Sequence, residues 1–232
     1  MPIKKWLVED HPDFHRLMIL SRHEFTAAKA HLLGSLSISQ RRRRKKLQKS
    51  RKLRLQIGAG SNVAEGWISV DIVSGVDLRL DLRRGLPLTK NSVQYIYSEH
   101  FLDHLHYPWG VHRVLKECQR VLEPGGVIRV VVHDAMKYFA AYVQNDNQYF
   151  QNLRDIGANP HETRMEFLNH IFRFNGLHQF IYDFETLRSV FLRAGFSDAR
   201  LSSINASVHP ELNLDQCSPD RNPQSLYAEA VK

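Results

Sequence analysis

A pair of glycines is the first feature of this sequence that points to a ligand. Gly58-Ala59-Gly60 directly follows the apolar run Leu53–Ile57. Glycine has no Cβ, so a ligand can approach the backbone there more closely than a side chain would allow. A dinucleotide fingerprint requires a third glycine, which this loop lacks. The loop therefore suits a nucleoside without a pyrophosphate, although a glycine pair after a strand also occurs in an ordinary tight turn.

Two aspartates close the next two apolar runs. Asp71, followed by Ile72, ends one of them, and Asp81, followed by Leu82, ends the other. Asp71 could accept hydrogen bonds from both hydroxyls of a ribose. Asp81 could meet an adenine amino group while Leu82 covers the ring. Either aspartate alone could be a turn or cap residue. In series after the glycine pair, they indicate a nucleoside site at the carboxyl ends of parallel strands.

Histidines gather after the fourth apolar run, in the segment Ser98-Glu99-His100-Phe101-Leu102-Asp103-His104. If this segment is helical, its two histidines and Asp103 share one face. A histidine oriented by a carboxylate can take the proton of an attacking hydroxyl. The same residues could ligate a divalent metal, or His104 could simply cap the turn; we expect no metal. The catalytic candidates are His100, Asp103, His104, His133 and His178.

Short apolar runs alternating with helical patterns predict a parallel sheet with helical crossovers. The expected strands are Leu53–Ile57, Trp67–Ile72, Val76–Leu80, Val93–Tyr97, Val127–Val132, Ala199–Ile204 and Leu226–Val231. Helices are expected over Pro108–Leu122 and after Asp183, and a helical insertion over 135–177 is expected to form a lid over the acceptor. Only ten residues separate Gly60 from Asp71. The first crossover helix must therefore be very short or absent.

The first 52 residues differ from the rest of the chain. Residues 1–40 show an amphipathic helical pattern, and residues 41–52 hold nine basic residues and no acidic one. Because the net charge of the chain is +8, the remainder is nearly neutral. A detachable basic run is more typical of a solvated linker or tether than of a nucleic-acid groove. The amphipathic segment could pack on the main domain, dimerise or lie on a membrane surface.

Cysteine usage and hydropathy narrow the class of protein further. Cys118 and Cys217 lie far apart without CxxC spacing, which argues against a disulfide framework and a zinc knuckle. No apolar run approaches the roughly 20 residues that cross a bilayer, and the N-terminus lacks the features of a signal peptide. We therefore expect a cytoplasmic protein, with peripheral membrane contact through residues 1–52 as an open alternative.

The ordered segments LRLQIGAG, GWISVDI, DLRLDL, SEHFLDHL and RVLEPGG resemble the class I S-adenosylmethionine-dependent methyltransferases of the methyltransferase-11 type. The resemblance implies a Rossmann-like α/β fold over 53–232, a seven-stranded and mostly parallel sheet with helices on both faces, and an antiparallel last strand. It also implies that the glycine loop holds the amino-acid part of the cofactor, Asp71 the ribose, and Asp81 with Leu82 the adenine. The cofactor-binding candidates are Gly58, Ala59, Gly60, Asp71, Ile72, Asp81, Leu82, Ser98 and Glu99. Gln56 departs from the acidic residue that commonly opens the glycine motif.

The expected reaction is in-line methyl transfer to an oxygen of a small-molecule or glycan acceptor, because the Asn/Asp-Pro-Pro-Tyr motif of many amino methyltransferases is missing. Such chemistry depends mainly on positioning, with a base needed for a hydroxyl. Three other functions stay open. One is an RNA or protein methyltransferase that uses the basic segment, and another is a noncatalytic partner protein of the same fold. The third is a membrane-tethered enzyme that acts on a lipid-linked acceptor. Sequence does not give the oligomeric state.

Overall fold

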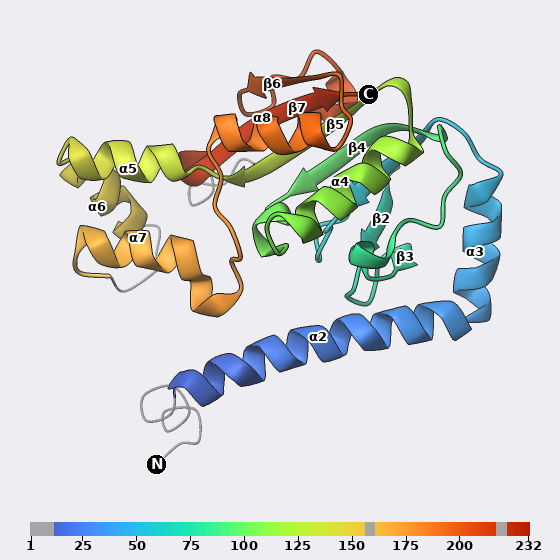
Figure 1. Cartoon of the computed structure of the whole chain (residues 1–232), viewed down its shortest axis with the longest axis horizontal. Helices are drawn as coiled ribbons and strands as arrows, with labels where there is room; N and C mark the ends of the chain where they lie inside the picture. Colours follow the sequence, from blue (N-terminus) through green and yellow to red (C-terminus); the bar gives the residue numbers. More distant parts are fainter. Residues whose placement is uncertain (1–11, 156–160, 217–221) are drawn as a thin grey trace.

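A seven-stranded sheet forms the centre of the molecule (Figure 1). The computed structural model describes residues 12–155, 161–216 and 222–232. The strands are β1 Leu53–Ile57, β2 Ile68–Asp71, β3 Leu78–Arg79, β4 Val93–Glu99, β5 Leu122–His133, β6 Asp198–Ser202 and β7 Ser225–Val231. Their order is β3-β2-β1-β4-β5-β7-β6, and β7 alone runs antiparallel to the other strands. The expected fold class, including the antiparallel last strand, is confirmed.

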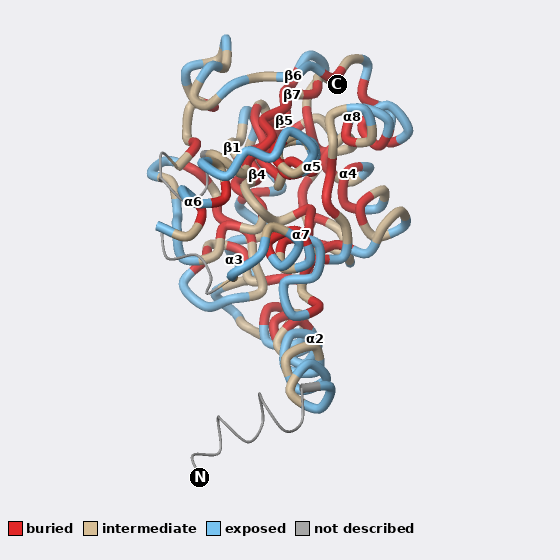
Figure 2. Tube along the Cα trace, turned by 90° about the vertical axis from the view of Figure 1, so that its left-hand side faces the viewer, coloured by how far each residue is buried: buried red, intermediate tan, exposed pale blue. Residues whose placement is uncertain are grey.

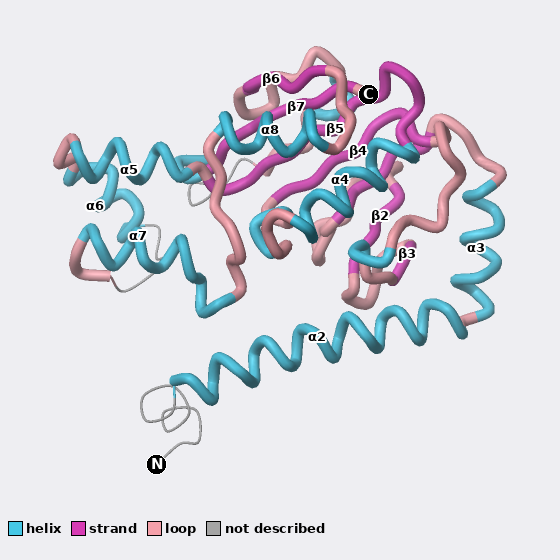
Figure 3. Tube along the Cα trace, viewed as in Figure 1, coloured by secondary structure: helices cyan, strands magenta, loops and turns pink. Residues whose placement is uncertain are grey.

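Helices alternate with these strands and extend beyond them (Figure 3). The α-helices are α2 Pro12–Leu36, α3 Ile38–Gln48, α4 Trp109–Val121, α5 Ala135–Val143, α6 Asn147–Asp155, α7 Arg164–Arg173 and α8 Phe184–Arg193. The short 3₁₀ helices are η2 Leu82–Arg84, η3 Leu102–His104, η4 Phe174–Gly176, η5 Pro210–Leu212 and η6 Asn222–Gln224. No helix separates β1 from β2, as the short spacing predicts. None of the described helices is long and apolar enough to cross a membrane.

The two faces of the sheet are covered differently. Helices α4 and α8 pack on one face, where the β-branched and leucine side chains of β1, β4 and β5 form the main core. The opposite face carries aromatic side chains from the sheet, with Trp67, Tyr95 and Tyr97 among them, and is covered by η5 and loops. Buried residues accordingly concentrate in the sheet and its helices (Figure 2). The carboxyl ends of the parallel strands stay free of this packing, so they can form a site.

The insertion expected over 135–177 is helical and forms a small unit of its own. Helices α5, α6 and α7 enclose a separate cluster that includes Tyr138, Phe150 and Phe167. Thr163 starts α7 with a capping box, in which its side chain accepts from the Glu166 backbone and the Glu166 side chain accepts in return. The unit projects from the carboxyl end of β5, as Figure 1 shows.

The basic segment 41–52 is largely helical, whereas a linker was expected. Ser37 adopts an extended conformation and caps α3 by accepting a hydrogen bond from the Gln40 backbone. Arginine and lysine are good helix formers, so their run continues the helix once it is capped. One of these basic side chains contacts the main domain, because Arg43 forms a salt bridge with Asp77 just before β3. The segment is therefore attached to the edge of the sheet. Cys217 lies outside the described residues.

Candidate functional site

The glycine pair forms a tight turn after β1 with open space beside it. Gly58 and Gly60 both have positive φ, +64° and +55°, which glycine adopts at little cost. A Cβ on Gly58 would lie 2.4 Å from the Cβ of Phe101, whereas a Cβ on Gly60 would meet no atom within 4 Å. Gly58 is thus required by close packing below the loop. Gly60 borders space that a ligand can enter.

Asp71 lies at the end of β2 and holds the glycine loop in place. Its carboxylate accepts hydrogen bonds from the backbone N–H groups of Gly60, at 2.9 Å, and of Ile72 and Val73. A carboxylate offers about four acceptor positions, so three are filled and one is left. Asp71 can therefore accept one ribose hydroxyl without giving up a backbone bond, and the expected contact with both hydroxyls stays a prediction.

Asp81 is buried at the end of β3 and is engaged by Arg83. It caps η2, and the Arg83 backbone and guanidinium both donate to its carboxylate. The guanidinium also makes two hydrogen bonds with Glu24 of α2, at 2.7 and 2.9 Å. Burial raises the pKa of Asp81, but the Arg83 hydrogen bonds outweigh burial and the pKa lies below its usual value. Asp81 can contact an adenine amino group only if Arg83 shifts.

A cavity of about 580 Å³ opens beside these strand ends, within the range of ligand sites. Its wall contains seven predicted site residues: Gly58, Asp71, Ile72, Asp81, Leu82, His100 and His104. Helix α2 supplies the remaining side through Leu20, His23, Glu24 and Ala27. Sequence reasoning missed this contribution of α2. The only signal was the small buried residues Ala27, Ala30 and Gly34, which let the helix approach the domain closely.

The other cofactor candidates lie around this cavity without lining it. Ala59 is buried within the turn, and Ser98 is fully buried near the end of β4. The Glu99 carboxylate accepts a hydrogen bond of 3.0 Å from the Tyr97 hydroxyl. Gln56, which replaces the usual acid, bonds the backbone of Asn62 and Ala64 and so stabilises the glycine loop. Gln56 therefore has a structural role at this position.

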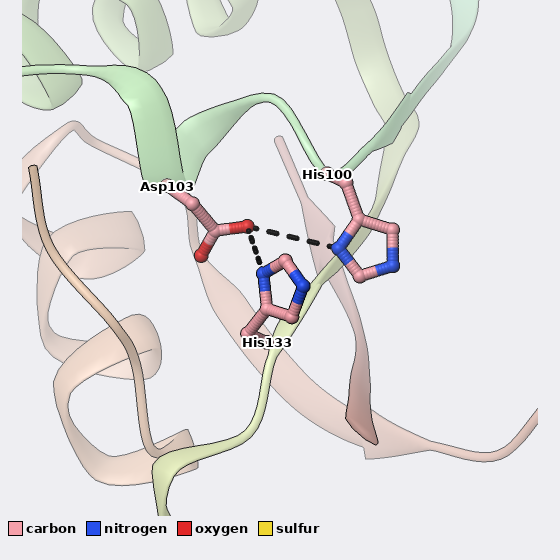
Figure 4. A group of neighbouring side chains, drawn as sticks. All are labelled: His100, Asp103 and His133. Carbon is pink, nitrogen blue, oxygen red and sulfur yellow. Dashed lines mark hydrogen bonds and ion pairs between the residues drawn. The ribbon is translucent and has the colours of Figure 1, made fainter. Parts of the chain in front are cut away.

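Three catalytic candidates converge on one point (Figure 4). Asp103 is fully buried, and its Oδ2 lies 3.1 Å from Nδ1 of His133 and 3.8 Å from Nδ1 of His100. His100 has a strained left-handed backbone, with φ of +47°, which turns its ring toward β5. Burial alone would raise the pKa of Asp103, but its interactions with the nearby imidazoles of His100 and His133 outweigh burial and keep that pKa below its usual range.

His104 and His178 lie next to this group and are fixed by backbone carbonyls. The segment after β4 is not an α-helix: η3 covers only Leu102–His104, so His104 turns away from Asp103 and bonds the Leu177 carbonyl at 3.1 Å. Nδ1 of His178 bonds the Ile171 carbonyl. Burial lowers the pKa of both imidazoles, that of His178 to about 4. Both are therefore neutral at physiological pH.

Part of this sequence matches a known protein family. A family model described as a methyltransferase domain matches residues 55–130. A search of curated proteins gives no match. Among solved structures, an S-adenosylmethionine-dependent methyltransferase from Archaeoglobus fulgidus is 16% identical, with a TM-score of 0.47 over 83% of this chain and 90% of that one. Another, from Mesorhizobium loti, is 14% identical, with a TM-score of 0.44 over 86% of this chain and 100% of that one.

The matched residues contain the glycine turn, Asp71 and Asp81, and the strands that carry them. The cavity beside them fits a nucleoside cofactor, because it has ligand-sized volume and is lined by Gly58 and by Asp71, whose carboxylate has one acceptor position left. Residues 55–130 thus match a methyltransferase domain, and the protein is an S-adenosylmethionine-dependent methyltransferase.

Proposed function

We propose that this enzyme methylates a hydroxyl oxygen of a small molecule or saccharide, with His104 as the general base. The observation that carries the proposal is the hydrogen bond between His104 Nδ1 and the Leu177 carbonyl, in the wall of the cofactor cavity. A carbonyl only accepts, so Nδ1 must carry the proton and Nε2 presents a lone pair. Among the described residues, no hydrogen-bond partner occupies Nε2 of His104.

Both the charge state and the position of His104 suit proton abstraction. Burial keeps its pKa below the usual value, so the imidazole is neutral and ready to accept a proton near pH 7. S-adenosylmethionine supplies an activated methyl group on a sulfonium. The hydroxyl proton moves to Nε2 of His104, the acceptor oxygen forms a bond to the methyl carbon, and the carbon–sulfur bond breaks with its electron pair kept by sulfur. His100 and Gln179 line the same cavity and help to enclose the acceptor.

Methyl transfer from radiolabelled cofactor to a panel of methyl hexopyranosides and phenols tests this assignment. We expect His104→Gln to lower turnover by about 10²-fold, the lower end for general-base catalysis, with cofactor affinity unchanged in calorimetry. His112→Gln on α4 is the matched control, because His112 lies outside the cavity wall. Full turnover of His104→Gln would rule out this base. Loss of cofactor binding in Asp71→Ala is the companion expectation for the nucleoside site.

The outer face of α2 supports a further part of the proposal, contact with an anionic membrane surface. Of the seven large apolar side chains exposed on this helix, five form one stripe: Phe14 is exposed by 53%, Met18 by 46%, Phe25 by 71%, Leu32 by 60% and Leu36 by 66%. At 3.6 residues per turn they fall within about 40° of one another, opposite the buried Ala27 face. Exposed apolar stripes of this kind mark surfaces that bind another protein or a membrane.

The charges beside this stripe favour lipid over a second copy of the chain. Arg22 and Lys29 flank it and are exposed, whereas Glu24 faces Arg83 on the inner side. Basic α3 follows directly. Two such faces would repel each other in a dimer, but anionic headgroups attract them. The same orientation would bring the strand ends close to the membrane, where a lipid-linked saccharide could enter.

Point variants are better suited than deletion of residues 1–52, because α2 forms part of the cavity wall. We expect the full chain to float with phosphatidylglycerol-containing vesicles but not with phosphatidylcholine alone. Phe25→Glu and Leu32→Glu should abolish flotation. Val208→Glu is an equally exposed control, since Val208 is 84% exposed elsewhere on the molecule. Unchanged flotation of both α2 variants, or a dimer in light scattering that either variant dissociates, would contradict membrane contact.

A further inference from the structure

The cluster of His100, Asp103 and His133 contains the donor set of a divalent metal site. Two imidazole nitrogens and one carboxylate oxygen lie within 4.8 Å of one another, on two segments that meet at the carboxyl ends of β4 and β5. Imidazole and carboxylate together suit zinc and similar first-row cations. Catalytic zinc sites commonly use three protein ligands and leave a fourth position open.

The distances between the donor atoms match those around a bound cation. Tetrahedral zinc with bonds near 2.1 Å separates its ligand atoms by about 3.4 Å. The two observed separations from Asp103 Oδ2, 3.1 Å to His133 Nδ1 and 3.8 Å to His100 Nδ1, lie on either side of this value. Both Nδ1 atoms point toward the same carboxylate oxygen (Figure 4). Only small side-chain shifts would be needed to admit the ion.

Two buried atoms in the cluster are left without a hydrogen-bond partner. Oδ1 of Asp103 and Nδ1 of His100 are both inaccessible and unbonded among the described residues, and Asp103 is fully buried. A buried polar atom without a hydrogen-bond partner destabilises the fold unless an ion or a water molecule contacts it. The separation of 3.8 Å between His100 and Asp103 is too long for a hydrogen bond. The gap suits an ion between these atoms better than it suits a shared proton.

The surroundings of His100 are also those of a metal ligand. Its Nε2 lies 3.2 Å from the Ser225 hydroxyl. When Nε2 donates to this oxygen, Nδ1 presents its lone pair toward Asp103, and this outer hydrogen bond is the usual way that proteins orient a ligating histidine. His100 also forms part of the cavity wall. A hydroxyl in the cavity is therefore close to the open coordination position.

We infer that His100, Asp103 and His133 bind one divalent transition-metal ion, such as Zn²⁺, which holds the acceptor oxygen beside the cofactor. The binding site stands on the geometry alone, while its role in catalysis rests on the proposed hydroxyl methylation. A metal-bound hydroxyl loses its proton more readily than a free one, so proton transfer to His104 would become easier. The bond broken at that stage would be O–H, with the proton moving to His104, and an ion held by His100, Asp103 and His133 would stabilise the negative charge that develops on the acceptor oxygen.

Metal binding is measured on the full chain, without a histidine tag and after treatment with EDTA. We expect one equivalent of Zn²⁺ in calorimetry, and one equivalent of Co²⁺ with the intense visible absorption of a four- or five-coordinate site. His100→Gln and His133→Gln should each weaken binding by at least tenfold, the scale on which even outer-shell partners act. His112→Gln on α4 should bind normally. Circular dichroism confirms that each variant remains folded.

The outcomes separate this inference from the proposed function. Folded His100→Gln and His133→Gln variants that bind Zn²⁺ as well as wild type would overturn the site, as would only weak, multiple binding that His112→Gln also reduces. Metal-stripped protein that still transfers methyl groups at full rate would overturn the role of the ion and leave the hydroxyl methylation standing. A stripped protein that binds cofactor normally, is inactive and recovers with Zn²⁺ or Co²⁺ would support both.

Discussion

Alanine at Gly58 should mainly destabilise the fold, whereas alanine at Gly60 should mainly weaken cofactor binding, although both glycines have the same backbone conformation. Left-handed backbone costs an alanine about 1 kcal/mol at either position. At Gly58, the new Cβ would also lie 2.4 Å from Phe101 Cβ, an overlap that forces the turn and Phe101 apart. Overpacking of this kind costs about 1–3 kcal/mol more. We therefore expect Gly58→Ala to lower the free energy of unfolding by about 2–4 kcal/mol and Gly60→Ala by about 1 kcal/mol.

Urea unfolding followed by circular dichroism measures the stability difference, and calorimetry measures cofactor affinity. Gly60→Ala should fold nearly normally yet bind S-adenosylmethionine at least tenfold more weakly, since its methyl group would occupy the open space beside the loop. Two results would refute this reasoning. One is a Gly58→Ala protein as stable as wild type, which would mean that Phe101 moves freely. The other is a Gly60→Ala protein with unchanged cofactor affinity, which would place the ligand elsewhere.

Three further predictions concern buried groups. Burial lowers the pKa of His178 to about 4, so between pH 6.5 and 4 the unfolded chain binds a proton at this residue and the folded chain does not. The free energy of unfolding should therefore fall by up to about 3 kcal/mol as the pH is lowered from 6.5 to 4. In urea titrations, His178→Gln should reduce this dependence on pH. Arg129 is fully buried and paired with Asp215, so Arg129→Met leaves that carboxylate without its partner and should cost about 3–5 kcal/mol in the same assay. Burial raises the pKa of Cys118 to about 12, so in a Cys217→Ser background iodoacetamide should label Cys118 only when the protein unfolds, as mass spectrometry would show.

Local patterns were sufficient for the cofactor side of the site. Strands β1 and β2, the turn at Gly58 and the aspartates Asp71 and Asp81 are contiguous or nearly so, and each is identified by apolar runs that end in glycine or a carboxylate. The parallel arrangement then brings the strand ends together automatically. The pattern could not show which hydrogen bonds these two carboxylates already accept from the protein itself. Arg83 is only two residues from Asp81, but its simultaneous pairing with Glu24 depends on tertiary structure.

The acceptor side depended on contacts between distant segments. His100, Asp103 and His133 were each candidates, but an α-helix after β4 would have grouped His104 with Asp103 instead of His133. The left-handed backbone of His100 and the short η3 determine the actual grouping, and neither has a periodic signal. Ser225, which bonds His100, lies 125 residues away in the chain. Thirteen histidines in one sequence gave no basis for choosing among such combinations.

Helix α2 has two distinct faces: its inner face closes the cavity at the strand ends, and its outer face stays exposed. Glu24 holds Arg83, and Arg83 in turn occupies Asp81, so the position of α2 and the availability of Asp81 are coupled by charge-assisted hydrogen bonds. If adenine is to reach Asp81, Arg83 must release that carboxylate, and Glu24 is then its remaining acidic partner among the described residues. Cofactor binding would thus transfer the Arg83 pairing toward α2 and strengthen the attachment of this helix to the domain. Helix α2 is therefore better regarded as part of this cavity wall than as an accessory extension.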